Sequence, residues 1–136
     1  HPMDHNVRCR HLENYQIQAI SEGHSWIIDE PESVDGDDLG PNPFESLLGS
    51  LGSCTLITVY HYAAQQDIPV EKLWTEIGGE WRGEGEDEVY HVENTVHVRG
   101  DLSEQDVQRL EKAAMRCPVH GLLSEGADID VAVVAD

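Results

Sequence analysis

The stretch Gly40-Pro-Asn-Pro-Phe-Glu-Ser-Leu-Leu-Gly-Ser-Leu-Gly-Ser-Cys54-Thr55 contains the signals for a helix start and, further on, a cysteine. Asn42 is a good N-cap, Pro43 suits the first helical position, and Glu45 completes a capping box three residues after the cap. No Asp, Glu, Lys or Arg occurs from Ser46 to Gln66, although 26% of the chain is charged. A run of this length without charge must be mostly buried. The stretch therefore predicts a central helix that ends near Gln66.

The segments on both sides of this helix have the patterns of strands. Alternating residues over 7–28 predict two or three strands, and the acidic, turn-rich residues 29–40 predict an exposed loop. Residues 70–100 predict strands on either side of a Gly-rich acidic turn at 83–87. A last alternating strand is predicted at 128–134.

Two shorter helices are predicted between those strands. Ser103 is an N-cap with Asp106 at the third helical position, and the apolar spacing continues to Arg116. Pro118 then favours the start of a short helix through Leu123. The order of elements predicts an α+β fold in which mostly antiparallel sheets pack on helices.

The length of 136 residues predicts a single domain over 1–136, with His1-Pro2 ahead of Met3 interpreted as a cloning remnant. The chain has 27 acidic and 8 basic residues and a net charge of −19, which argues against nucleic acid or anionic membrane as a partner. So few lysines beside so many carboxylates favour a salt-adapted source over an ordinary acidic protein. No apolar run is long enough for a transmembrane helix, and the N-terminus has no signal-peptide pattern, so we expect a cytoplasmic protein.

Three cysteines, an odd number in a protein expected to be cytoplasmic, do not predict a disulfide framework. Cys9 has no motif around it. Cys54 lies within the uncharged helix and Cys117 follows another helix, which together suggest dithiol redox chemistry.

Each of these two cysteines also has a simpler interpretation. Cys54 lies about three turns into its helix, where the helix dipole no longer helps a thiolate, so it needs a cation from elsewhere. Without one, it is a small buried hydrophobe. Cys117 is next to Arg116 and at the start of the helix opened by Pro118, but it could also be a plain helix-end residue. The residues alone leave open which thiol attacks and which resolves.

Other residues near the cysteines are weaker candidates. Glu45 is a capping residue first and a carboxylate near the thiol second. His120 could orient a substrate or the thiol. A metal site built from Cys117-x-x-His120 with Cys54 or His61 is weak, because the chain has no second paired motif, so we expect no metal.

Four segments of the sequence together carry a specific resemblance to a known family. The segments His24–Glu32, Gly40–Thr55, Gly100–Ser103 and Cys117-Pro-Val-His120 closely resemble the OsmC/Ohr family, the osmotically inducible protein C and organic hydroperoxide resistance proteins. The resemblance extends from about Val7 to Val134. It implies an OsmC-like swapped homodimer, with mostly antiparallel sheets around long central helices and a thiol peroxidase site at the dimer interface.

The resemblance also implies the roles of individual residues. Cys54 attacks the O–O bond of an organic hydroperoxide, or of hydrogen peroxide, and becomes a sulfenic acid; Cys117 condenses with it to a disulfide, which an external dithiol reduces. An arginine from the N-terminal strand region, Arg8 or Arg10, and Glu45 complete the site, and no cofactor is implied. Glu45 matches the OsmC-like branch, since the organic hydroperoxide resistance branch has its glutamate one position earlier.

Two alternatives to a peroxidase follow from the same residues. One is a non-catalytic OsmC-like dimer that binds a small apolar ligand at its interface. The other is a redox sensor, in which the disulfide itself is the output.

Overall fold

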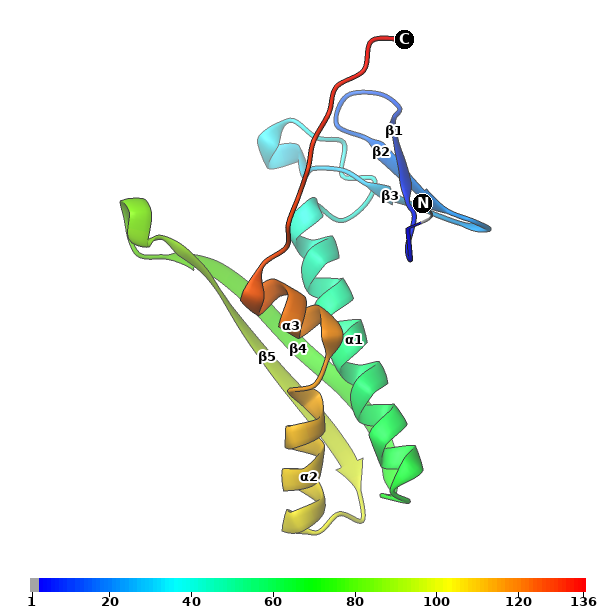
Figure 1. The fold of residues 1–136 in the computed structure, drawn as a ribbon, viewed down its shortest axis with the longest axis vertical. Coiled ribbons are helices and arrows are strands. Elements are labelled where there is room, and N and C mark those ends of the chain that lie inside the picture. Colours follow the sequence, from blue (N-terminus) through cyan, green and yellow to red (C-terminus); the bar gives the residue numbers. More distant parts are fainter. Residues whose placement is uncertain (1–2) are drawn as a thin grey trace. The chain divides into compact units, whose positions relative to one another are not determined.

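The computed structural model describes residues 3–136, which excludes His1-Pro2, the predicted cloning remnant. The chain divides into two compact units, one ending at Gly49 and the other beginning at Ser50 (Figure 1). The single domain over 1–136 stays a prediction.

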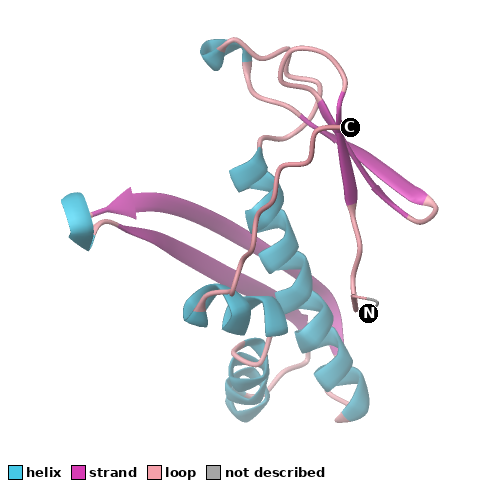
Figure 2. Cartoon of the chain, turned by 45° about the horizontal axis from the view of Figure 1, so that its top comes forward, coloured by secondary structure: helices cyan, strands magenta, loops and turns pink. Residues whose placement is uncertain are grey.

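The first unit is built on a small antiparallel sheet. Strands β1 (Arg8–His11), β2 (Ile17–Ser21) and β3 (His24–Ile28) pair in sequence order (Figure 2). The predicted loop follows, with a short 3-10 helix, η1 (Glu32–Val34).

A buried carboxylate organises that loop. Asp29 is only 1% exposed, and its carboxylate accepts hydrogen bonds from the backbone N–H groups of Glu30 (2.7 Å) and Leu39 (3.1 Å). Burial by itself raises the pKa of Asp29, but these donors, with one from Asp37, outweigh it, and the pKa lies below the ordinary value. Hydrogen bonds to the buried Asp29 carboxylate therefore hold the loop that leads into the central helix.

The central helix α1 (Pro43–Gln65) begins at the predicted capping box. The Asn42 side chain accepts from the Glu45 N–H at 2.8 Å, and the Glu45 carboxylate accepts from the Asn42 N–H at 2.9 Å. Two N–H groups of the first turn are thereby satisfied, as the sequence predicts.

In the second unit, α1 packs on a long two-stranded ribbon of β4 (Val70–Arg82) and β5 (Val89–Gly100), joined by the 3-10 helix η2 (Gly85–Asp87). A side-chain carbon at Gly52 would lie 3.0 Å from Thr75 Cγ2, so the absence of a side chain lets α1 approach β4 closely. The core is a cluster around Val59, which is fully buried, with Ala63, Ile68 and Leu110.

Two helices complete this unit. Helix α2 (Glu104–Ala114) has the predicted capping box of Ser103 and Asp106, and helix α3 (Pro118–Glu125) begins at the predicted proline with Cys117 as its N-cap. The α+β class with antiparallel sheets is thus confirmed. Within residues 3–136, no helix has the length and apolarity needed to cross a membrane.

The predicted last strand at 128–134 is wrong for this chain. Residues 127–136 are outside any helix or strand, and both sheets are formed without them. A strand needs a partner for its backbone N–H and C=O groups, and the described chain offers none here. The apolar side chains of the alternating pattern are instead exposed, up to 96% at Val133.

Candidate functional site

Two thiols from different helices meet in the second unit. Cys54 lies in the middle of α1 and Cys117 caps α3. Both are free, and their side chains are within hydrogen-bonding contact of each other. Cys54 is half-buried, whereas Cys117 is only 1% exposed. This is the pair of cysteines that the sequence predicts to act together.

The start of α3 surrounds the Cys117 sulfur with hydrogen-bond donors. The His120 N–H donates to Cys117 Sγ at 3.4 Å, and the N–H of Val119 and the hydroxyl of Thr55 also contact the sulfur. Burial alone raises the pKa of Cys117, but the hydrogen bond from Cys54 and these donors outweigh it, so the pKa is lowered. The predicted role of the α3 N-terminus in stabilising a thiolate is supported by this geometry.

The environment of Cys54 raises the pKa of its thiol instead. Burial raises the pKa of the Cys54 thiol, and its hydrogen bond with Cys117 raises it further. The Val119 N–H and the Thr58 hydroxyl compensate only in part. The contact between the two thiols therefore lowers the pKa of Cys117 and raises that of Cys54.

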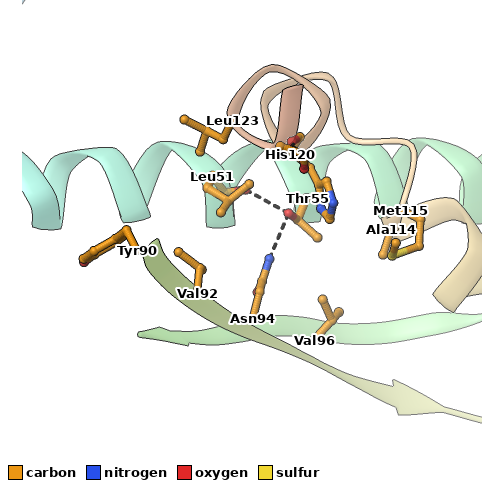
Figure 3. A pocket seen from close by; sticks show the side chains of 11 residues that line it. Leu51, Thr55, Tyr90, Val92, Asn94, Val96, Ala114, Met115, His120 and Leu123 are labelled. Carbon is orange, nitrogen blue, oxygen red and sulfur yellow. Dashed lines mark hydrogen bonds between the residues drawn. The ribbon is translucent and has the colours of Figure 1, made fainter. Parts of the chain in front are cut away.

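A series of neutral polar groups runs from the ribbon to Cys117. Figure 3 shows the part of it formed by Asn94 and Thr55. The Asn94 amide donates to Thr55 Oγ1 at 3.0 Å, and the Thr75 hydroxyl donates to the Asn94 carbonyl oxygen. Thr55, itself 2% exposed, donates to the Leu51 carbonyl at 2.8 Å. Thr55, Thr75 and Asn94 are not among the site residues predicted from the sequence. One signal was present, because Asn94 interrupts the apolar side chains on the inner face of β5.

A cavity of about 430 Å³ adjoins this polar series, bounded by α1, β5, α3 and the end of α2 (Figure 3). Thr55 and His120 belong to its lining and also contact Cys117. Most of its other lining side chains are apolar: Leu51, Val92, Val96, Ala114, Met115 and Leu123. The cavity therefore offers an apolar space next to the thiol pair.

The remaining predicted residues lie in the first unit. Arg8 and Arg10 are exposed on β1, where Arg10 Nε donates to Gln18 Oε1 at 2.9 Å. Glu45 is engaged in the capping box. The catalytic roles of these three residues stay predictions.

The side chains of Arg116 and His120 are not among the groups that shift the pKa of Cys117. Arg116 places its guanidinium 5.3 Å from the Tyr62 ring centre and is not among the groups that shift the Cys117 pKa. His120 acts on the thiol through its backbone N–H. Among residues 3–136, no three His, Cys, Asp or Glu side chains are grouped so that they could hold a metal ion.

Comparison with solved structures shows the same fold in several bacterial proteins. An OsmC-like protein from Mycoplasma pneumoniae is 22% identical, with a TM-score of 0.76 over 90% of this chain and 89% of that chain. An organic hydroperoxide resistance protein OsmC from Legionella pneumophila is 15% identical, with a TM-score of 0.68 over 90% and 91%. A third, an organic hydroperoxide resistance protein from Elizabethkingia anophelis, is 15% identical, with a TM-score of 0.65 over 88% of each chain.

Sequence comparison leads to the same family. No curated protein matches the chain. Residues 36–132, which include both Cys54 and Cys117, match the family model of the OsmC-like proteins. The chain therefore belongs to the OsmC-like protein family.

Proposed function

We propose that this protein is a thiol-dependent peroxidase that reduces organic hydroperoxides through Cys54 and Cys117. The observation that carries the proposal is the contact between these two free thiols across α1 and α3. Family membership supports it, because some structural neighbours are organic hydroperoxide resistance proteins.

The difference in exposure between the two thiols supports a different role for each in the reaction. Cys54 is half-buried and can meet a substrate, whereas the 1% exposed Cys117 is suited to react with its neighbour. The Cys54 thiolate attacks one peroxide oxygen, the O–O bond breaks, and the alkoxide leaves and is protonated to the alcohol. Cys117 then attacks the sulfenic sulfur of Cys54, water is lost, and the resulting disulfide is reduced by an external dithiol.

Arg8 or Arg10 is proposed to hold the peroxide and stabilise negative charge, with Glu45 orienting the arginine. A guanidinium is suited to this role because it is always charged and donates in a fixed geometry. The three residues are candidates on the strength of the family resemblance.

We further propose a homodimer, because α1 exposes large apolar side chains such as Ile57 (68%) and Tyr60 (67%) in the isolated chain. A second copy covering this face would bury them. The cycle needs free thiols, which the cytoplasm maintains, and we propose that compartment.

The proposal is tested by adding one equivalent of cumene hydroperoxide to the reduced protein and locating oxidation by intact and peptide mass spectrometry. A Cys54–Cys117 disulfide should form, with one peroxide consumed per subunit. Cys54→Ser should lose turnover, Cys117→Ser should stop at a Cys54 sulfenic acid, and Cys9→Ser should behave as the parent, since Cys9 is exposed on β1. Normal turnover in the Cys54→Ser protein would refute the assignment.

The apolar cavity favours a second candidate, a non-catalytic dimer that binds a small apolar ligand. This candidate predicts that both thiols stay reduced in excess peroxide at low and at high salt. It also predicts that an apolar compound is released when the purified protein is denatured, which mass spectrometry of the extract would detect.

A further inference from the structure

A cluster of cationic and aromatic side chains lies on the ribbon, on the face turned away from the hydrophobic core. Leu73 of β4 packs against the core. Because successive side chains of a strand point to opposite faces, its neighbours Lys72 and Trp74 are on the other face. Their register partners on β5, Arg99 and His97, share that face. Together these four residues form what we call the outer patch.

Trp74 gathers the two cations of the outer patch. Its ring is stacked on that of His97, with ring centres 5.0 Å apart and an interplanar angle of 11°. Lys72 Nζ lies 5.3 Å from the Trp74 ring centre, and the guanidinium carbon of Arg99 lies 5.6 Å from it. A tryptophan ring attracts cations through its electron-rich face. Two positive charges are therefore held at a single ring.

A β-bulge decides which side chain faces Arg99. Val70 pairs with Gly100, but the next pair is Lys72 with Arg99, so Glu71 has no partner in the ladder. An uninterrupted antiparallel register would put Glu71 opposite Arg99 and form a pair of opposite charges. The bulge instead puts two positive charges directly opposite each other, which destabilises a sheet. An anion between them would relieve this repulsion.

The hydrophobic core explains the bulge but not the charges that the bulge brings together. Val70 and Leu73 are three residues apart and both pack against the core, which the extra residue allows. Lys72 is exposed and takes no part in that packing. It is one of two lysines in a chain with 27 acidic residues, so a carboxylate opposite Arg99 would be the ordinary outcome. The lysine at this position therefore calls for another explanation.

The acidic residues of the chain do not neutralise the two cations. Within residues 3–136, neither Lys72 nor Arg99 forms an ion pair with a carboxylate. Glu76, the next residue of β4 on the same face, is instead 3.4 Å from Nε2 of His97. Both cationic side chains are exposed, so their charges are available to a ligand from solution.

The surface of the ribbon next to the outer patch limits the size of that ligand. Glu76, Glu80 and Glu93 line a depression further along the ribbon. An acidic protein laid along this face would meet those carboxylates, and the net charge of −19 would repel it as a whole. A small anion would contact the positive end alone. The charges thus favour a small anion over an acidic protein.

We propose that Lys72 and Arg99 bind the phosphate group of a small ligand. Two opposed cations match the double negative charge of such a group. A guanidinium donates two parallel hydrogen bonds to phosphate oxygens, and the lysine adds a point charge. The site is separate from the thiol pair and does not depend on the peroxidase proposal.

The test uses Trp74 as the reporter, in a parent protein that carries Trp26→Phe and Trp81→Phe and so has no other tryptophan. Inorganic phosphate is added at about pH 8, where it is largely doubly charged, and at constant low ionic strength. Because both cations contact the ring, an anion that draws them away should change the Trp74 fluorescence with saturation. The urea midpoint should also rise with phosphate, since a ligand of the folded state stabilises it.

Substitutions at the two cations locate the site. Lys72→Gln and Arg99→Gln should each weaken phosphate binding by about tenfold or more, the effect of losing a hydrogen bond to a charged group. Arg99→Lys keeps the charge and should weaken it less. Lys112→Gln on α2 is the matched control, because it changes the net charge by the same amount as Lys72→Gln, and it should bind phosphate as the parent does.

A charge reversal separates loss of the site from loss of the fold. Lys72→Glu puts a carboxylate opposite Arg99, so it should abolish phosphate binding. Its urea midpoint in phosphate-free buffer should be no lower than that of the parent, because opposite charges across a sheet stabilise it. Circular dichroism confirms that each variant is folded.

Three results would overturn the inference. The first is a fluorescence change that does not saturate. The second is a Lys112→Gln protein that loses as much affinity as Lys72→Gln, which would show a response to net charge alone. The third is malonate, a dicarboxylate, binding as tightly as phosphate. Failure of the peroxidase proposal looks different, because cumene hydroperoxide should form the Cys54–Cys117 disulfide equally well in Lys72→Gln and in the parent.

Discussion

Two glycines of α1 allow the contact between the central helix and the ribbon to be measured. A side-chain carbon at Gly52 would lie 3.0 Å from Thr75 Cγ2 and 3.7 Å from Ile77 Cγ2, whereas one at Gly49 meets nothing within 4 Å. Both are in the same helix. Substitution by alanine therefore has the same effect on helix propensity at both positions and a different effect on packing.

The expected magnitudes follow from these distances. Replacing glycine by alanine inside a helix stabilises by about 1 kcal/mol, and we expect that full gain for Gly49→Ala. At Gly52 the added methyl group forces Thr75 away, and overpacking typically costs about 1–3 kcal/mol. Gly52→Ala should thus range from neutral to about 2 kcal/mol destabilised, which separates the two variants by about 1–3 kcal/mol.

Urea unfolding followed by circular dichroism measures this difference, at equal protein concentration because a dimer unfolds in a concentration-dependent way. With a slope of about 2 kcal/mol per molar urea, the two midpoints should differ by about 0.5–1.5 M. Equal stabilisation of both variants would refute the close approach of α1 to β4. A stabilised Gly52→Ala beside a destabilised Gly49→Ala would place the close contact about one turn earlier in the helix, at Gly49.

Four further predictions concern the rest of the chain. Asn42→Ala should destabilise the protein by about 1 kcal/mol in thermal unfolding, and an unchanged transition would show that the capping box contributes nothing. The lowered pKa of Asp29 means that its contribution to stability is present above the ordinary carboxyl pKa of about 4 and is lost as the pH falls through the lower folded-state value. The deficit of Asp29→Asn in urea should accordingly be largest at neutral pH and disappear in acid; a pH-independent deficit would contradict this. Ile57→Asp should convert a dimer to a monomer in analytical ultracentrifugation, and a dimer that survives it would exclude this face of α1 as the interface. Because the net charge is −19, the urea midpoint should rise between about 0.1 M and 1 M KCl as the screening length falls from about 10 Å to 3 Å, and a flat dependence would argue against strong self-repulsion.

Local signals in the sequence predicted local structure well. The start of α1 could be predicted because Asn42 and Glu45 need only each other and the backbone between them. The start of α3 is similar, since Pro118 fixes the first helical residue and places Cys117 at the N-cap. The order of helices and strands follows from such signals and from the alternation of β4 and β5.

The contacts that define the site join residues that are far apart in the sequence. That Cys54 meets Cys117 was a hypothesis until the packing of α3 on α1 was known, and Thr55 and Asn94 come together from α1 and β5. A strand is likewise a property of two segments, which is why the alternating pattern at 128–134 did not suffice. The pattern predicts what the segment can form, and the available partner decides whether it does.

The exposed extended segment at 127–136 has a consequence for the lifetime of the chain. Proteases cut most readily in exposed segments that no tertiary contact holds in place. Ile129, Val131 and Val133 are 75%, 86% and 96% exposed in the isolated chain, so in a subunit without a partner this segment is open to cleavage. If a second copy covers this segment, assembly also protects the chain from digestion, and subunits left without a partner are the ones removed first.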